Sequence, residues 1–231
     1  MAKDGFDYYR CRNCDGLFVW PLKTQKFYLN TDTYLSNPNQ YAGMIDPYGQ
    51  RWMIEQFERL YHHTTGHEHK GTFFEVGAGA GYLTLFALAR GWEAYGIETS
   101  KPAVDFARNY LRVPVDHSII ETYKADKKFD AMAMVEVLEH FLDPAEAINS
   151  LRRLAKKTTF LFGTTPNTDS EHWRKSKQDI YVPDDHIFLF NEYTLRHLAE
   201  KVGIKNVTVE LFGSGDKHDS NLMYAGVIEG A

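Results

Sequence analysis

The segment Thr72–Ser100, TFFEVGAGAGYLTLFALARGWEAYGIETS, decides the predicted fold. It begins with a short run of aromatic and β-branched residues, Thr72–Val76, that is typical of a buried strand. Glycines at every second position follow, and then a stretch of strong helix formers, Tyr82–Arg90. A second strand, Glu93–Ile97, leads to the acid Glu98. The pattern predicts a strand, a glycine turn, a helix and a parallel second strand.

This arrangement indicates nucleotide binding. Gly77, Gly79 and Gly81 allow the backbone to turn sharply and allow a ligand to approach the peptide groups. The helix behind them directs its free N–H groups and its positive dipole end at that ligand. Glu98 follows Gly77 by roughly 20 residues, the distance at which a βαβ unit returns, and an acid there can accept both hydroxyls of a ribose.

The glycine spacing separates two classes of ligand. A dinucleotide site requires G-x-G-x-x-G, because the pyrophosphate lies on the helix end. Here the spacing is G-x-G-x-G, with Tyr82 where the third glycine would stand. Glu75, just before the turn, would repel a pyrophosphate and suits a ligand with a cationic end, such as an amino-acid ammonium. A glycine-rich turn in some other α/β protein is the alternative interpretation.

Composition narrows the class of protein. The 231 residues fit one ordinary domain with an appended segment, and 43% hydrophobic content can form a sizeable core. A net charge of −5, from 26 basic and 31 acidic residues, argues against a nucleic-acid partner. No apolar run approaches the length of a membrane span, and the polar start MAKDGFDYYR is not a signal peptide. We therefore expect a cytoplasmic enzyme with no membrane partner.

The first residues carry a C-x-x-C pair, Cys11 and Cys14, that looks like a zinc knuckle. A closed tetrahedral zinc site needs four ligands, and the chain has no second pair. Four histidines within residues 62–69 lie in a predicted polar loop, and no pattern brings them to the cysteines. We expect an N-terminal segment, residues 1–45, that keeps the knuckle hairpin without a metal, ahead of a catalytic domain, residues 46–231.

The segment Thr24–Tyr48 is rich in tyrosine, asparagine, threonine and proline. Its tyrosines are amphipathic, so they suit an irregular surface segment packed on the domain. They equally suit a lid, since aromatic rings can cover a site while their hydroxyls hold a substrate. Both interpretations stay open for Tyr28, Tyr34, Tyr41 and Tyr48.

Strands and helices alternate along the rest of the chain. The predicted strands are Thr72–Val76, Glu93–Ile97, Val113–Val115, Phe129–Val137, Thr159–Gly163, Val207–Leu211 and Leu222–Ile228. This alternation predicts an α/β fold with a doubly wound, mostly parallel, seven-stranded sheet of the Rossmann-like kind. The ligand of such a sheet lies beyond the carboxyl ends of the strands, at the point where the strand order reverses.

Four segments in order resemble the class I S-adenosylmethionine (SAM) methyltransferases that act on small molecules. Glu75–Gly81, E-V-G-A-G-A-G, resembles their first motif, and Val137–Pro144 resembles their V-L-E-H-x-x-D-P segment. Thr165–Asn167 matches their T-P-N, and Asp185–Phe190 resembles their D/E-H-x-x-x-F. Together these segments make the resemblance specific for the superfamily, over residues of about 70–230, and say little about the substrate.

The resemblance implies a SAM site at successive strand ends, made of Glu75, Gly77, Ala78, Gly79, Gly81, Tyr82, Glu98, Thr99, Ser100, Ser118, Ile119, Val135 and Glu136. Glu75 and the glycine turn would hold the methionine part, and Glu98 would hold the ribose hydroxyls. Val135 and Glu136 would lie under the sulfonium. Ser118 stands where these enzymes usually have an aspartate, so the contact with the adenine amino group is left open.

Two histidines are candidates for a general base, because the free imidazole pKa lies near neutrality. His140 follows the fourth strand and His186 precedes a predicted helix on the acceptor side; a structural role is the alternative for each. We expect a SAM-dependent methyltransferase that methylates a small molecule. A hydroxyl oxygen is the preferred acceptor atom, and a sugar is one candidate acceptor. The alternatives are a nitrogen or carbon acceptor, a non-catalytic SAM-binding assembly protein and, less compatible with Tyr82, a NAD-type oxidoreductase.

Overall fold

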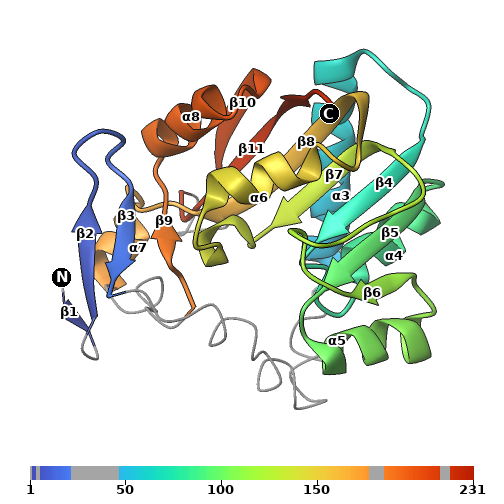
Figure 1. The fold of residues 1–231 in the computed structure, drawn as a ribbon, viewed down its shortest axis with the longest axis horizontal. Helices are drawn as coiled ribbons and strands as arrows, with labels where there is room; N and C mark the ends of the chain where they lie inside the picture. The colour runs from blue at the N-terminus through green and yellow to red at the C-terminus, as the bar shows by residue number, and fades with distance from the viewer. Residues whose placement is uncertain (1, 4–5, 22–46, 177–184, 214–218) are drawn as a thin grey trace. The chain divides into compact units, whose positions relative to one another are not determined.

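The computed structural model describes residues 2–3, 6–21, 47–176, 185–213 and 219–231 (Figure 1). The chain divides into two compact units. Unit 1 consists of Met1–Tyr28, Met134–Asn149 and Phe162–Gly226, and unit 2 of Leu29–Ala133, Ser150–Leu161 and Val227–Ala231. The domain boundary expected after residue 45 lies outside the described residues, as do Tyr28, Tyr34 and Tyr41 of the expected lid.

The larger sheet has seven strands in the order β10-β11-β8-β7-β4-β5-β6. Its strands are β4 (Thr72–Val76), β5 (Glu93–Glu98), β6 (Val115–His117), β7 (Phe129–Val135), β8 (Ala155–Pro166), β10 (Lys205–Phe212) and β11 (Asn221–Ile228). The β4–β5 and β5–β6 pairs are parallel. The chain runs outward from β4 to β6 and then returns to β7 on the other side of β4, so the order reverses between β4 and β7. The predicted doubly wound α/β fold is confirmed.

Helices connect these strands. They are α3 (Pro47–Thr65), α4 (Tyr82–Ala89), α5 (Lys101–Phe106) with its continuation η2 (Ala107–Leu111), η3 (Leu138–His140), α6 (Pro144–Leu151), α7 (Glu171–Ser176) and α8 (Glu192–Lys201). α3 extends through Thr65 and so includes His62 and His63, which the sequence analysis placed in a loop. None of the helices found in the described parts of the chain is both long and apolar enough to span a bilayer.

The third strand of the chain's main sheet begins later than predicted. β6 starts at Val115 and not at Val113, although Val113 is buried. Arg112 takes a positive φ of 59°, which interrupts extended backbone, and Pro114 has no N–H to donate to a ladder. Pairing with β5 therefore begins opposite Gly96, at Val115.

The fourth and fifth strands also differ in length from the prediction. β7 ends at Val135, two residues early, because Glu136 takes a positive φ of 52°. β8 extends well beyond Thr159–Gly163 in both directions, to Ala155 and Pro166. The apolar pattern located the buried centres of these strands, whereas single backbone conformations set their ends.

Unit 1 contains the four-stranded sheet β1-β2-β3-β9. β1 (Ala2–Lys3), β2 (Phe6–Arg10), β3 (Leu17–Trp20) and β9 (Phe188–Leu189) pair in antiparallel fashion. Its buried cluster consists of Tyr8, Leu17, Val19 and Leu189. The hairpin expected around the two cysteines is present, with both cysteines in the turn between β2 and β3.

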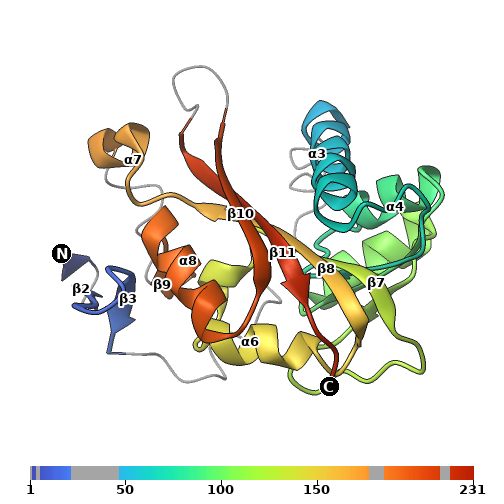
Figure 2. The same cartoon turned by 90° about the horizontal axis from the view of Figure 1, so that it is seen from above.

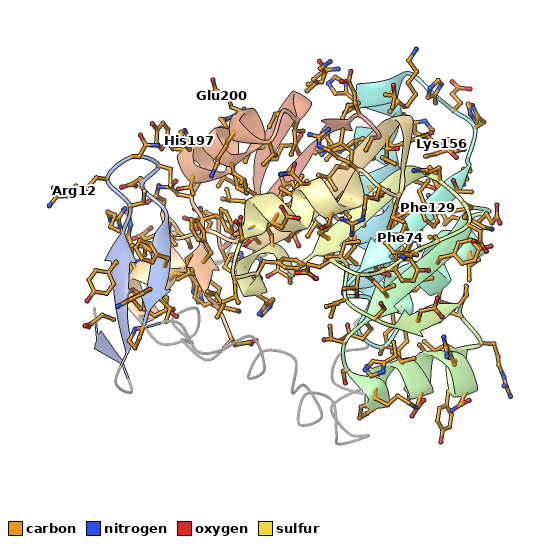
Figure 3. The ribbon with its side chains drawn as sticks, in the orientation of Figure 1. Arg12, Phe74, Phe129, Lys156, His197 and Glu200 are labelled. Atoms are coloured by element: carbon orange, nitrogen blue, oxygen red, sulfur yellow. The ribbon has the colours of Figure 1, made fainter. Side chains whose placement is uncertain are left out.

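Aromatic side chains form the centre of unit 2, where α3 lies beside α4 (Figure 2). The ring of Phe57 on α3 packs edge-on against Phe73, Trp92 and Phe160, with centroid distances of 5.1, 5.2 and 5.6 Å. Phe74 on β4 stacks on Phe129 of β7 at 4.7 Å, and both are labelled in Figure 3. These contacts fix β4, and with β4 the start of the glycine turn.

We predict that Phe57→Ala lowers the free energy of unfolding by about 3–5 kcal/mol, because the fully buried ring leaves a cavity that its rigid neighbours cannot fill. Tyr110→Ala is the matched control: that ring is 77% exposed, and its loss should cost less than about 1 kcal/mol. Urea unfolding followed by circular dichroism measures both values. Equal losses in the two variants would show that the aromatic cluster does not stabilise unit 2.

Candidate functional site

The glycine turn between β4 and α4 adopts backbone conformations that favour glycine. Gly77, Gly79 and Gly81 have φ values of 69°, 52° and 85°. Such left-handed conformations strain residues with a Cβ atom, and a Cβ on Gly81 would also lie 2.7 Å from Val113 Cγ2. The turn is joined to β5 through the Ala78 N–H, which donates to the Ile97 carbonyl at 2.9 Å. The three predicted glycines are thus required by the shape of the turn.

Glu98 binds the turn from the end of β5. Its carboxylate is buried, and Oε2 accepts a hydrogen bond from the Gly79 N–H at 2.8 Å. Oε1 accepts from the N–H groups of Thr99 and Ser100, at 2.7 and 2.8 Å. A carboxylate oxygen has two lone pairs, so Oε2 keeps one acceptor position beyond its bond to Gly79. That position is suited to a hydroxyl donor.

The end of β6 lies beside these residues. The Ser118 N–H donates to the Glu98 carbonyl at 3.1 Å, and His117 Nε2 lies 2.8 Å from the Thr99 carbonyl. The Ser118 hydroxyl donates to the Ile119 carbonyl at 3.4 Å, and both side chains are half-buried. The structure thus brings together the residues that the sequence analysis assigned to the ribose and adenine.

Glu75 is buried in β4, where its Oε2 accepts a hydrogen bond from the Thr84 hydroxyl at 2.5 Å. Burial raises the pKa of Glu75 to about 8, opposed by the Thr84 hydrogen bond and assisted by the charge of Glu98. The side chain is therefore mostly protonated at neutral pH. A cationic ligand group would favour the ionised form. Tyr82, the first residue of α4, is half-buried with its ring centroid 6.3 Å from that of Phe106.

In unit 1, Glu136 directly follows Val135, the half-buried last residue of β7. Its N–H donates to the Thr164 carbonyl at 3.1 Å, and its Oε1 accepts from Asn221 Nδ2 at 3.0 Å. The side chain is open to solvent, yet the protein atoms around it and the charge of Glu139 raise the pKa of Glu136 to about 8.

The imidazole of His140, in η3, lies between two acids. Nδ1 is 2.9 Å from both the backbone oxygen and Oδ1 of Asp185. Nε2 is 3.9 Å from Oε1 of Glu139. Burial lowers the pKa of His140, but the Asp185 hydrogen bond and the charge of Glu139 outweigh it, and the pKa is raised to about 9. The two predicted histidines do come together, because the ring of His186 lies 5.1 Å from that of His140.

Glu139 is a buried acid in the same group. Its Oε2 accepts a hydrogen bond from the Thr165 hydroxyl at 2.9 Å, whereas its Oε1 has no hydrogen-bond partner in the described part of the chain. Burial raises the pKa of this carboxyl, although the charge of His140 opposes the effect. Glu139, His140 and His186 offer ligand atoms within 4.8 Å of one another, so these three side chains could hold a metal ion.

The cysteines lie in the tight turn of the N-terminal hairpin. The Cys11 N–H donates to the Gly16 carbonyl at 2.8 Å, and the Asp15 N–H donates to the Cys11 carbonyl at 3.0 Å. Backbone hydrogen bonds lower the pKa of Cys11, while burial raises that of Cys14. Over the described ranges, no group of three metal-binding side chains includes either cysteine. The expectation that the pair holds no zinc on its own stays a prediction.

The sequence analysis assigned no role to Asp185, Glu139 or Thr84, which are direct partners of predicted site residues. Thr84 lies one helical turn into α4, close to Glu75 only because the glycine turn folds back. Asp185 and Glu139 lie within the segments that resemble those of the methyltransferases, so the sequence contained them without indicating their contacts. However, no spacing rule relates Asp185 to His140, 45 residues away.

Comparisons with known sequences identify a protein family and related proteins. The family model described as "Methyltransferase domain" matches residues 50–209. The ubiquinone biosynthesis O-methyltransferase of Alkalilimnicola ehrlichii is 33% identical over 106 residues, which cover 43% of each chain. The protein of the same name from Nitrosomonas europaea is 30% identical over 109 residues, 44% of this chain and 46% of that one. The chain thus spans less than half the length of these curated relatives.

Solved structures share the fold. The plantazolicin methyltransferase BpumL in complex with SAH has a TM-score of 0.66 at 16% identity, covering 89% of this chain and 95% of that one. A SAM-dependent methyltransferase from Archaeoglobus fulgidus has a TM-score of 0.59 at 17% identity, covering 78% and 94%. At these identities the likeness shows the fold, and the family follows from the match over residues 50–209. The chain belongs to the methyltransferase domain family.

Proposed function

We propose that this chain binds SAM and transfers its methyl group to a hydroxyl oxygen of a small molecule. Family membership supports methyl transfer, and the names of the curated relatives support oxygen as the acceptor atom. The observation that carries the proposal is the pair of buried carboxyls at the glycine turn, Glu75 and Glu98. A ligand with a ribose at one end and an ammonium at the other matches both, and a pyrophosphate matches neither.

Each side chain then has a defined task toward the cofactor. Glu98 Oε2, which keeps one lone pair, would accept one ribose hydroxyl while the other hydrogen bonds of the carboxylate hold the turn. Glu75 faces the ammonium of the methionine part. The half-buried Ser118 and Ile119 lie where the adenine edge is read. Binding thus uses the ends of β4, β5 and β6, all within unit 2.

Catalysis needs alignment and removal of one proton. SAM, when bound, would supply an already activated methyl carbon, so the residues of the chain would mainly have to align the acceptor oxygen with it. His140 is our candidate to accept the hydroxyl proton, and His186 is the second candidate. The sequence alone suggested the ordinary histidine pKa, but the neighbouring acids raise that of His140 to about 9. Only a minor fraction of this imidazole is neutral at pH 7, and that fraction grows as the pH rises.

The first functional prediction concerns proton release. Because the pKa of Glu75 is about 8 in the free protein, SAM binding at pH 7 should release close to one proton per SAM as the carboxyl ionises. Affinity should therefore increase from pH 6 to pH 8. Glu75→Gln should weaken SAM binding by roughly 1.5–3 kcal/mol and abolish the proton release. Calorimetry in two buffers of different ionisation enthalpy measures both quantities.

Glu93→Gln is the matched control for Glu75→Gln, since Glu93 lies at the exposed start of β5 in an ion pair with Lys127. This variant should keep wild-type affinity and proton release. If Glu75→Gln still released the proton, another group would carry the linkage and the assignment of the ammonium to Glu75 would be wrong.

A further prediction concerns His140 as the base. The kcat of the wild-type enzyme with a hydroxyl acceptor should rise with pH and level off near pH 9, as the imidazolium of raised pKa loses its proton. His140→Ala should lower kcat roughly 10²–10⁴-fold and remove this rise, with little change in SAM affinity. Formation of SAH that depends on the acceptor measures kcat, and it also separates a transferase from a protein that only binds SAM.

His197→Ala serves as the control, because His197 lies on α8 and contacts the side chain of Asn13 in the hairpin turn. It should retain wild-type kcat at every pH. A His140→Ala enzyme that is folded and keeps more than about a third of wild-type kcat would exclude His140 as the base and direct attention to His186.

A further inference from the structure

Three side chains with metal-binding atoms converge in unit 1. Glu139 and His140 lie on η3, directly after β7, and His186 lies just before β9. One ligand atom from each lies within 4.8 Å of the other two, and Nε2 of His140 is 3.9 Å from Oε1 of Glu139. Atoms that share one ion at the usual distance of about 2.1 Å are about 3–4 Å apart, so small side-chain movements would bring all three onto one ion.

The Glu139 carboxylate is the part of this group that most requires a ligand. Its side chain is only 1% exposed, and the Thr165 hydroxyl donates to Oε2 at 2.9 Å. Oε1 is buried as well, and no group in the described part of the chain donates a hydrogen bond to it. A buried acceptor without a donor is unfavourable and therefore rare in proteins. Since Oε1 faces Nε2 of His140, a cation between these two atoms would satisfy it.

The ring of His140 is oriented in the way that metal sites orient a histidine ligand. Its Nδ1 lies 2.9 Å from both the backbone oxygen and Oδ1 of Asp185. Because two acceptors face Nδ1, this nitrogen carries the proton, and Nε2 keeps the lone pair of the neutral ring. Histidine ligands usually donate their other N–H to a carboxylate or a backbone carbonyl, which fixes the tautomer and the direction of the ligand nitrogen. Here the same residue offers both kinds of acceptor.

We propose that Glu139 Oε1, His140 Nε2 and a ring nitrogen of His186 bind one divalent transition-metal ion. The two segments that supply these ligands are joined, because the Ile187 N–H donates to the Glu139 carbonyl at 2.8 Å. Two imidazoles and one carboxylate suit Zn²⁺ or a similar first-row ion, whereas Mg²⁺ and Ca²⁺ prefer ligand sets made of oxygen. Three protein ligands leave at least one coordination position for water or for an oxygen of a small molecule.

Ion binding goes beyond the proposed function and does not depend on it. It has one consequence for catalysis, because an ion on Nε2 of His140 occupies the nitrogen that would accept a proton. The role of His140 as a base therefore belongs to the ion-free protein, and its kinetics are measured with a chelator present. In the ion-bound protein, the positive charge of the ion would lower the pKa of a hydroxyl bound to it.

The test is a titration of the full chain, first freed of metal with a chelator, with Co²⁺ as the probe. The wild-type protein should bind one Co²⁺ at this site, seen as visible absorption of the bound ion and as paramagnetic shifts of the ring signals of His140 and His186. Zn²⁺ should displace the probe and Mg²⁺ should not. Glu139→Gln and His186→Gln should each weaken binding at least about 10-fold, since even the loss of an outer partner of a ligand costs that much.

Two control variants should bind Co²⁺ as the wild type does. Asp169→Asn removes an exposed carboxylate that pairs with Arg174 in the same unit, and a double Cys11→Ser, Cys14→Ser variant removes the thiols. Circular dichroism checks that each variant is folded.

The proposal is overturned if the wild-type protein binds neither Co²⁺ nor Zn²⁺. It is also overturned if folded Glu139→Gln and His186→Gln keep wild-type affinity, or if only the cysteine variant loses the ion, because the ion then lies elsewhere. SAM binding is measured on the same samples. A protein that binds the ion at this site but does not bind SAM would refute the proposed function and leave the metal site standing.

Discussion

The strand ends that we propose to bind the cofactor depend on the hydrogen bonds of the Glu98 carboxylate. It is buried and accepts backbone hydrogen bonds from Gly79 in the turn and from Thr99 and Ser100 at the start of α5. Charge-assisted bonds of this kind are worth about 1.5–3 kcal/mol each, so one side chain joins the glycine turn to the following βα unit. The residue that we assign to the ribose therefore also holds the protein surface against which that ribose would lie.

Unit 1 shows a second arrangement, in which acids surround an imidazole. Glu139 is buried with one oxygen unpartnered among the described residues, and its charge together with the Asp185 contact favours a cationic His140. Glu136, at the end of β7, has a raised pKa for a related reason. Shifted pKa values are typical of catalytic sites, because burial and neighbouring charges there set the protonation states that acids and bases need.

The fold could be predicted wherever its signals are local. β4, the glycine turn and β5 follow the apolar runs and the glycines. The start of β6 and the end of β7 could not be predicted, because they depend on the positive φ values of Arg112 and Glu136. The candidate site was partly predictable, because many of its residues lie in segments that resemble methyltransferase motifs. The pairing of Asp185 with His140 was not, because it arises only when two distant segments of the chain fold together.

The central claim is that the carboxyls at the ends of β4 and β5 recognise the two polar ends of one SAM molecule. A crystal structure of the complex with SAH tests this claim most directly. Our account predicts one ribose hydroxyl within hydrogen-bond distance of Glu98 Oε2, with Gly79 still bonded to it, and the ammonium on the ionised carboxylate of Glu75. SAH bound elsewhere, or bound at the turn with Glu75 still engaged only by Thr84, would contradict the account.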